Sequence, residues 1–249
     1  MPHERFDISA YQQVTGTVCR REFIPENTRL MPVPLVPEIS LYVAHEAVPL
    51  WQKTEEELGE MGLPPPFWAF AWAGGQALAR YILDNPPVVR GRKVLDLASG
   101  SGLVAIAAMK AGAGSVIAAD IDCFALEAIR LNASANHVVV GVCGGDLLDG
   151  PPPDVDVIVV GDLFYEKALA ERLIRWLDVA ARQEISVLIG DPGRSYLPQD
   201  RLVSCASYDV PVTRDLEDAD IKNSQVWLLD RRCIALGPCP QHNAGKLTY

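Results

Sequence analysis

Four aspartates follow short apolar runs in this chain, at points where a parallel sheet would bring their carboxylates to one edge. They are Asp96, Asp120, Asp146 and Asp162. Open α/β sheets bind ligands in the crevice beyond the carboxyl ends of their strands. Carboxylates gathered there can attract a cation, accept hydrogen bonds from sugar hydroxyls and orient an amine. These four residues are therefore the first candidates for a functional site.

The most informative segment, residues 93–102, reads KVLDLASGSG: an apolar run and then a glycine turn, followed by helical residues. Glycine permits positive φ and lets a ligand approach the backbone. Two cofactors fit this geometry. Residues 100–105 satisfy the G-x-G-x-x-A spacing of dinucleotide folds, but the carboxylate of Asp96 would repel a pyrophosphate. The same carboxylate would attract a sulfonium cation, so the turn favours S-adenosylmethionine, with Gly100 and Gly102 close to it.

Further cofactor contacts are expected after the second and third strands. Asp120 lies 18 residues beyond the turn and is expected to hold ribose hydroxyls, whereas Asp122 is expected to cap the next helix. Asp146 can accept a hydrogen bond from the adenine amino group, or it is simply a turn residue. The predicted cofactor site also includes three neighbours of these residues: Ala98, Ile121 and Leu147.

The fourth apolar run leads into GDLFYE, which places Asp162 beside two aromatic rings. Methyl transfer to nitrogen requires a neutral amine, although lysine has a pKa of ~10.4 in water. Asp162 can orient the ammonium and then the amine, while Phe164 and Tyr165 hold the cation against their faces. We therefore predict a catalytic Asp162 with substrate contacts from both rings. The alternatives are core packing for Phe164 and Tyr165 and a helix N-cap for Asp162.

An aromatic segment, PFWAFAWAGGQ at residues 66–76, precedes the glycine turn. Its small residues, above all Gly74 and Gly75, are expected to allow close approach to the methionine part of the cofactor. The alternative is the start of a helix packed on the sheet, which we favour for Phe70.

The elements that position these residues alternate between strand and helix. Strands are expected at 94–95, 116–119, 138–142, 155–160 and 185–189, and a final strand pair at 201–211 and 225–236. Helices are expected at 68–83, 104–109, 124–135 and 169–180. Upstream, residues 1–37 read as irregular, 39–43 as a short strand and 54–57 as a capping box. Repeated βα units closed by a strand pair predict an α/β fold whose sheet is mostly parallel with an antiparallel edge.

Composition narrows the class of protein. The 249 residues carry a formal charge of −10 and no cluster of Lys and Arg, which argues against nucleic acid as a partner. No apolar run reaches the ~18 residues that a membrane span needs, and the acidic segment Met1–Ala10 does not read as a signal or transit peptide. The four histidines and six cysteines lack the spacing of metal ligands, so we expect no metal. Three of the cysteines are expected to be reduced core residues.

The motifs together resemble a known family. Asp162-Leu-Phe-Tyr165 resembles the D-x-x-Y motif of the seven-strand protein lysine methyltransferases. The resemblance to the electron transfer flavoprotein beta-subunit lysine methyltransferases extends over residues 35–235 and rests on segments 37–39, 54–58, 62–66, 67–78 and 190–198. It implies a class I (seven-strand, Rossmann-like) fold and S-adenosylmethionine as cofactor. It also implies a cofactor contact from Trp72 and a catalytic role for Asp162.

The resemblance further implies a substrate, a location and a domain plan. The expected substrate is the flavoprotein beta subunit, and charge together with resemblance suggests that Glu38 meets its basic segment. A ribosomal protein, a small-molecule amine and an inactive cofactor-binding module remain the alternatives. We expect a bacterial cytoplasmic protein, or a mitochondrial matrix protein if the source is eukaryotic. The expected domains are an N-terminal extension (1–65), a methyltransferase domain (66–236) and a C-terminal tail (237–249).

Overall fold

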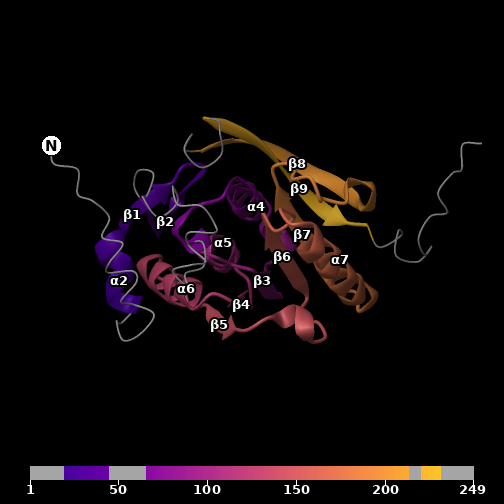
Figure 1. Ribbon diagram of the computed structural model, residues 1–249, viewed down its shortest axis with the longest axis horizontal. Helices are drawn as coiled ribbons and strands as arrows, with labels where there is room; N and C mark the ends of the chain where they lie inside the picture. Colours follow the sequence, from indigo (N-terminus) through magenta and orange to yellow (C-terminus); the bar gives the residue numbers. More distant parts are fainter. Residues whose placement is uncertain (1–19, 45–65, 213–219, 231–249) are drawn as a thin grey trace, which may run out of the picture.

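The computed structural model describes residues 20–44, 66–212 and 220–230. Its centre is a seven-stranded sheet (Figure 1). The strands are β3 (Lys93–Leu97), β4 (Ser115–Asp120), β5 (Gly141–Gly144), β6 (Val157–Gly161), β7 (Ser186–Asp191), β8 (Leu202–Pro211) and β9 (Ile221–Leu229). Their order is β5-β4-β3-β6-β7-β9-β8; β9 runs antiparallel to both β7 and β8, and the other neighbouring pairs are parallel. The predicted mostly parallel sheet with an antiparallel edge is confirmed.

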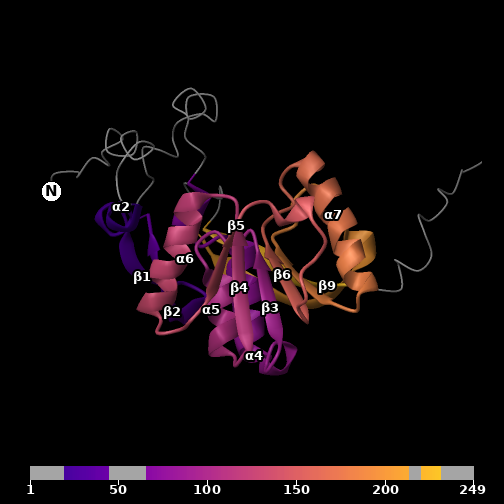
Figure 2. The same ribbon diagram turned by 90° about the horizontal axis from the view of Figure 1, so that it is seen from below.

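Helices cover both faces of the sheet. The helices are α4 (Ala73–Asp84), α5 (Leu103–Lys110), α6 (Cys123–Ala135) and α7 (Lys167–Arg182). The first three lie on one face and α7 covers the other (Figure 2). The central strand β6 is buried on both sides, since Val157 and Val159 pack with α4 and α5, and Ile158 and Val160 pack with α7. Burial on both faces explains why this strand reads as a continuous apolar run.

Helix α4 starts later than the sequence suggests. The expected start at residue 68 is occupied by a short 3-10 turn, η1 (Phe67–Ala69), and Phe70 and Trp72 then have extended backbone. The helix ends at Asp84, just before the Pro86-Pro87 pair that forms η2 (Pro86–Val88). The delay matters for the site, because it places the first turn of α4 directly over the carboxyl ends of β6 and β7.

Glycine lets α4 touch the sheet backbone. A Cβ added to Gly74 would lie 2.3 Å from the Gly190 carbonyl oxygen, and one added to Gly190 would lie 2.1 Å from the Gly74 oxygen. A Cβ on Gly161 would lie 3.2 Å from the Gly75 Cα. Gly74 admits strand β7, and the expected close approach of the cofactor to the double glycine stays a prediction. The first amides of α4 are thereby brought within reach of side chains at the ends of β6 and β7.

The upstream region contains more structure than its prolines indicate. Residues 20–44 form α2 (Arg20–Asn27) and a hairpin of β1 (Arg29–Val33) and β2 (Val36–Val43). Only the strand at 39–43 was expected, because Pro25, Pro32 and Pro34 suggested irregular chain. The hairpin and α2 lie outside α6, on the side away from α7 (Figure 2). The predicted capping box at 54–57 lies outside the described residues.

Two further expectations need correction. The third strand is β5 at residues 141–144 rather than 138–142, because the chain leaves α6 through a turn in which His137 has φ +58 and Val139 is 84% exposed. The three described cysteines are free, as expected, but Cys123 and Cys205 are exposed rather than in the core. Elsewhere the remaining strands and helices of residues 93–212 fall within a few residues of their expected places.

Candidate functional site: the carboxyl edge of the sheet

The glycine turn between β3 and α5 has the backbone that its sequence predicts. Ala98, Gly100 and Gly102 all have positive φ, at 53, 54 and 84 degrees. Gly102 is the N-cap of α5, and a Cβ there would lie 3.3 Å from the Cα of Ile129 on α6. The turn is therefore shaped by left-handed backbone and by the close approach of α6.

Asp96 lies beneath this turn rather than on its surface. Its side chain is buried, and Oδ2 accepts hydrogen bonds from the Ser99 hydroxyl at 2.5 Å and from the Ala105 amide at 2.9 Å. Burial raises the pKa of the Asp96 carboxyl to about 7, although these two hydrogen bonds act to lower it. The residue predicted to attract the cofactor's cation thus also ties the turn to the start of α5.

Asp120 holds the other side of the turn. Its Oδ2 accepts the Gly100 amide at 2.8 Å and its Oδ1 accepts the Asp122 amide at 2.9 Å. Burial raises the pKa of the Asp120 carboxyl, against these backbone hydrogen bonds. Asp122 accepts the Phe124 amide at 2.8 Å as the N-cap of α6, which confirms that expectation.

Asp146 and Leu147 lie beyond β5, next to the end of β4. Asp146 is the N-cap of η3 (Leu147–Asp149) and accepts the Leu148 amide at 2.9 Å. Its Oδ2 also pairs with Arg172 of α7 at 2.6 Å. Asp146 therefore has the position of a turn residue, and Arg172 binds one of its two carboxylate oxygens. An adenine contact from Asp146 stays a prediction.

The carboxyl edge fits a nucleoside cofactor that carries a positive charge. Carboxylates of Asp96, Asp120 and Asp162 lie at the ends of three neighbouring strands, β3, β4 and β6. A carboxylate offers about four acceptor positions, so Asp120 can still accept a ribose hydroxyl. Beside it, Ile121 is 75% exposed and offers apolar surface to a base. These residues predicted for the cofactor thus lie along one edge of the sheet.

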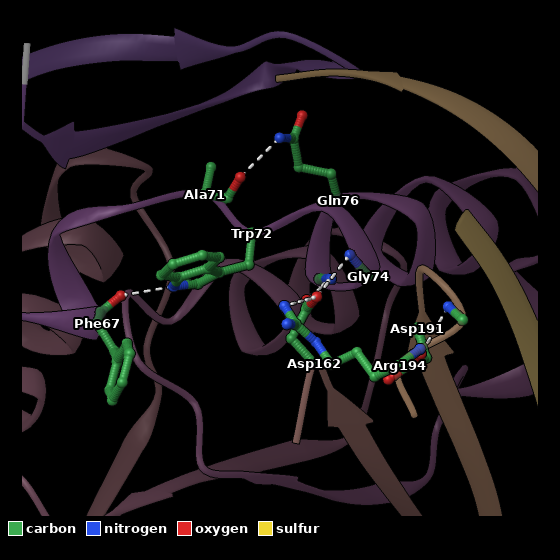
Figure 3. Close-up of polar contacts among 10 residues, drawn as sticks. Phe67, Ala71, Trp72, Gly74, Gln76, Asp162, Asp191 and Arg194 are labelled. Atoms are coloured by element: carbon green, nitrogen blue, oxygen red, sulfur yellow. Dashed lines mark hydrogen bonds and ion pairs between the residues drawn. The ribbon is translucent and has the colours of Figure 1, made fainter. Parts of the chain in front are cut away.

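Asp162 directly follows β6 and faces the first turn of α4 (Figure 3). The residue has φ +58, and its amide donates to the Gly190 carbonyl at 2.9 Å. The carboxylate accepts the amides of Gly74 at 3.1 Å and Gly75 at 2.7 Å. Asp162 therefore does not cap the helix that follows it; its carboxylate binds the N-terminus of α4. Amides at a helix N-terminus stabilise a negative charge.

Arg194, from the loop after β7, completes this cluster. Its Nη2 donates to Asp162 Oδ1 at 3.0 Å, and its guanidinium carbon lies 6.0 Å from the centroid of the Trp72 ring. The Asp162 side chain is only 9% exposed. Burial raises the pKa of Asp162, while Arg194 and the two glycine amides lower it. We call Trp72, Gly74, Gly75, Asp162 and Arg194 the Asp162 cluster.

Aromatic rings connect the Asp162 cluster to the glycine turn. The Trp72 indole donates to the Phe67 carbonyl at 2.9 Å, and its ring centroid lies 6.0 Å from that of Phe67. Phe67 in turn lies 5.9 Å from the exposed ring of Tyr165. A Cβ on Gly100 would come within 3.9 Å of the Phe67 oxygen. Phe67 thus lies between the cofactor turn and the predicted substrate end.

Two residues predicted to contact the substrate have partners within the chain. Phe164 is fully buried in the core around β6 and α7, so its ring packs the interior rather than an open surface. Glu38 on β2 pairs with Arg80 of α4 at 2.8 Å, and Arg80 also binds Asp84. The Glu38 side chain remains 50% exposed, so a contact with a substrate stays a prediction. Phe70 is buried, but it has extended backbone and packs with Phe23 and Phe124, so it is not the helix start on the sheet that we favoured for it.

The structure adds residues that the sequence reasoning did not assign. Phe67 was part of the aromatic segment, and Arg194 was part of the loop resembling the family, but neither received a role. Asp191 ends β7 and is fully buried beside them. Asn132 of α6 donates to the Ser101 carbonyl of the glycine turn at 2.7 Å. Asp191 could have been found from the sequence, because it lies at the end of an apolar strand. Nothing in the sequence distinguishes Asn132 from any other asparagine within a helix.

The strand order, the glycine turn and the strand-end carboxylates define a class I S-adenosylmethionine-dependent methyltransferase. A family model described as "Ribosomal protein L11 methyltransferase (PrmA)" matches residues 76–165. The electron transfer flavoprotein beta subunit lysine methyltransferase of Xenopus laevis is 39% identical over 221 residues, which cover 86% of this chain and 89% of the relative. The human protein of that name is 37% identical, covering 83% and 80%. The chain belongs to the family of electron transfer flavoprotein beta subunit lysine methyltransferases.

More distant similarities include a bacterial relative and a solved structure. The ribosomal protein L11 methyltransferase of Pelobacter propionicus is 33% identical over 153 residues, which cover 58% of this chain and 50% of the relative. Among solved structures, the ribosomal protein L11 methylase of Lactobacillus delbrueckii subsp. bulgaricus is 22% identical, with a TM-score of 0.48, and covers 65% of this chain and 81% of that one. The expected family, fold and cofactor are confirmed.

Within the described ranges, no helix is long and apolar enough to cross a membrane. The same residues contain no group of three or more His, Cys, Asp or Glu side chains that is placed to hold a metal ion.

Proposed function

We propose that this enzyme transfers methyl groups from S-adenosylmethionine to lysine side chains of the electron transfer flavoprotein beta subunit. Family membership supports the substrate, because the relatives carry that name. The observation that carries the proposal is the Asp162 cluster, a buried carboxylate beside the half-buried Trp72 at the end of the strand next to the cofactor turn.

Each part of the site has a task in this proposal. The glycine turn and Asp120 would hold the nucleoside, and the bound cofactor supplies a methyl group on a cationic sulfur. Asp162 accepts a hydrogen bond from the substrate amine and so points its lone pair toward that methyl. The rings of Trp72 and Tyr165 flank the aliphatic part of the lysine side chain. Positioning of the two reactants accounts for much of the rate in such transfers.

The direct test is methyl transfer to purified flavoprotein beta subunit with radiolabelled S-adenosylmethionine, followed by mass spectrometry of the labelled lysines. We expect wild-type enzyme to label the beta subunit. Asp162→Asn should lower turnover by at least about 100-fold, because the loss of a positioned polar group at a reacting centre costs rates of that order. Its affinity for S-adenosylhomocysteine should stay close to that of wild type. An unlabelled beta subunit would refute the proposed substrate.

A parallel assay in cell extract distinguishes the other substrates. The matching family model and the Pelobacter relative favour ribosomal protein L11 as the second candidate. Label in a small-molecule fraction would indicate a free amine, and cofactor binding without any label would indicate an inactive module. We further propose that the enzyme acts where the flavoprotein is found, in the bacterial cytoplasm or, in a eukaryote, in the mitochondrial matrix.

A further inference from the structure

Arg194 occupies the position in which a substrate cation would be expected. A carboxylate and an aromatic ring together form a binding site for an ammonium group. In this structure the guanidinium of Arg194 already pairs with Asp162 at 3.0 Å and lies 6.0 Å from the centre of the Trp72 ring (Figure 3). A lysine that approaches Asp162 therefore meets a carboxylate whose negative charge is already paired with Arg194.

The loop after β7 fixes the position of Arg194. Asp191 Oδ1 accepts the amides of Gly193 and Arg194, both at 2.7 Å, and the Arg194 carbonyl accepts the Leu197 amide at 3.1 Å. Asp191 itself is fully buried at the end of β7. These hydrogen bonds hold the backbone of Arg194 in place. The ion pair with Asp162 is therefore part of the fold.

The charges around Asp162 can be assigned element by element. Strand β6 contributes Asp162 itself, and α4 contributes the two glycine amides of its N-terminus. The loop after β7 contributes the cation of Arg194 and the carboxyl of Asp191. Burial, together with the nearby charge of Asp162, raises the pKa of Asp191 to about 6, against the lowering effect of Arg194. Arg194 is therefore the cation that balances two buried acids.

We propose that Arg194 is a positioning residue that compensates the charge of Asp162, so that the substrate lysine enters the site as a neutral amine. The inference rests on the proposed function, because it concerns how that same site receives a lysine. The ammonium proton passes to solvent as the lysine binds, and the nitrogen keeps its lone pair for the bond to carbon. Asp162 remains ionised and accepts a hydrogen bond from the amine.

The physical reason is the response of an amine to neighbouring charge. A like charge within about 4–6 Å disfavours the ammonium form, and an opposite charge favours it. Without Arg194, the free carboxylate of Asp162 would stabilise the ammonium and would hold the lysine in its unreactive form. With Arg194 present, the ion pair gives no net preference for the charged form. Arg194 thereby sets the pH range in which the enzyme works.

The first test needs no substrate. The free energy of unfolding is measured from pH 4 to 9 for the wild type, Arg194→Gln and Arg194→Lys. Removal of the cation raises the pKa of Asp162 in the folded state, so the wild type should gain stability over Arg194→Gln as pH rises through the two folded pKa values. Arg194→Lys should reduce this gain, and the gain should shrink when Asp162→Asn is present in both proteins. A difference that is the same at every pH would overturn the inference.

The second test is the pH dependence of kcat at saturating protein substrate, because kcat reports the ionisation of groups in the enzyme–substrate complex. The midpoint of its rise should move up by about one to three pH units in Arg194→Gln, whereas Arg194→Lys should keep the wild-type midpoint whatever its turnover. An unshifted midpoint in Arg194→Gln would overturn the inference while leaving the proposed function intact. Failure of the wild type to methylate the beta subunit would refute the proposed function alone, since the unfolding measurements still decide the electrostatic role of Arg194.

Discussion

At the scale of single residues, the fold controls the charge of Asp96 through burial. The folded carboxyl has a pKa of about 7, whereas an exposed aspartate has one near ~3.9. Between these values the folded protein holds a proton that the unfolded chain has lost, so stability falls as pH rises through that window. The carboxyl of Asp96 lies beneath the cofactor turn, and its ionisation lowers the stability of the folded protein.

Asp96→Asn tests this cost. Asparagine keeps an oxygen that can accept from Ser99 and Ala105 but carries no charge. Without cofactor, we expect the variant to exceed the wild type in unfolding free energy by on the order of 2–4 kcal/mol at pH 8, and by far less at pH 4.5. Urea unfolding at the two pH values measures it, with the exposed Asp209→Asn as control. A gain that does not depend on pH would contradict the assignment.

Sequence reasoning predicted where the acids lie but not what they touch. The positions of Asp96, Asp120 and Asp162 follow from strand ends, which apolar runs make visible. Arg194 is 32 residues from Asp162, and that pairing depends on the neighbouring positions of β6 and β7. Phe164 was ambiguous for a related reason, since an aromatic ring after a strand can point into the core or out of it.

At the scale of elements, the contact between α4 and β7 depends on one of two adjacent glycines. A Cβ on Gly74 would lie 2.3 Å from a backbone oxygen, but the nearest atom to a Cβ on Gly75 is Asp162 Oδ2 at 3.8 Å. Gly74→Ala must move the helix, and we expect a loss of about 1–3 kcal/mol or more in unfolding free energy. Gly75→Ala is the matched control and should gain up to about 1 kcal/mol from helix propensity. Equal effects in urea unfolding would refute the contact.

Asn132 of α6 and Asn136 at its C-cap both bind β2, and only Asn132 also binds the glycine turn. Asn132 accepts the Tyr42 amide at 2.7 Å and donates to Ser101, whereas Asn136 contacts Ser40 and its own helix. We expect Asn132→Ala and Asn136→Ala each to cost about 1–3 kcal/mol of stability. Only Asn132→Ala should weaken S-adenosylhomocysteine binding, because Ser101 lies within the turn. Calorimetric titration of both variants decides this, and equal affinities would argue against the link.

At the scale of the whole molecule, the expected N-terminal extension packs into the core of the methyltransferase domain. Ile39 and Leu41 of β2 are fully buried, in one cluster with Leu103 and Ile106 of α5. The extension thus supplies part of the interior of the main domain. The sequence suggested a separate extension because its prolines and the short strand hide the helix and the hairpin.

A chain that begins at residue 66 should consequently be much less stable. We expect its thermal midpoint to fall by on the order of 10 °C or its transition to lose cooperativity, since burial of each large apolar side chain contributes about 1.5–3 kcal/mol. Ile39→Ala in the full chain should give a smaller loss, and Leu30→Ala, at a site 47% exposed, should give little. Calorimetry of the three proteins measures the effect, and an unchanged midpoint in the shortened chain would show that the extension does not contribute to stability.

Most of the main domain was predictable because its strands and helices are local apolar patterns separated by glycine and proline. What escaped prediction depends on contacts between distant segments. The start of α4 is set by the glycine contact with β7, and β5 is shifted because residues 136–140 form the exit from α6. No pattern within either segment specifies these partners.

The asparagine contacts of β2 also bear on self-association. An unpaired strand edge invites another chain to add a strand, which is a route to aggregation. Along the outer edge of β2, Asn136 binds the amide and carbonyl of Ser40, Asn132 binds the amide of Tyr42, and the Ala44 amide donates to the Ala69 carbonyl. The side chains of Asn132 and Asn136 thus bind backbone groups that another strand would otherwise bind, and this edge of β2 is closed. The edge of the main sheet at β8 is instead interrupted by a register shift between Ser204 and Ala206 and ends at Pro211, features that discourage strand addition.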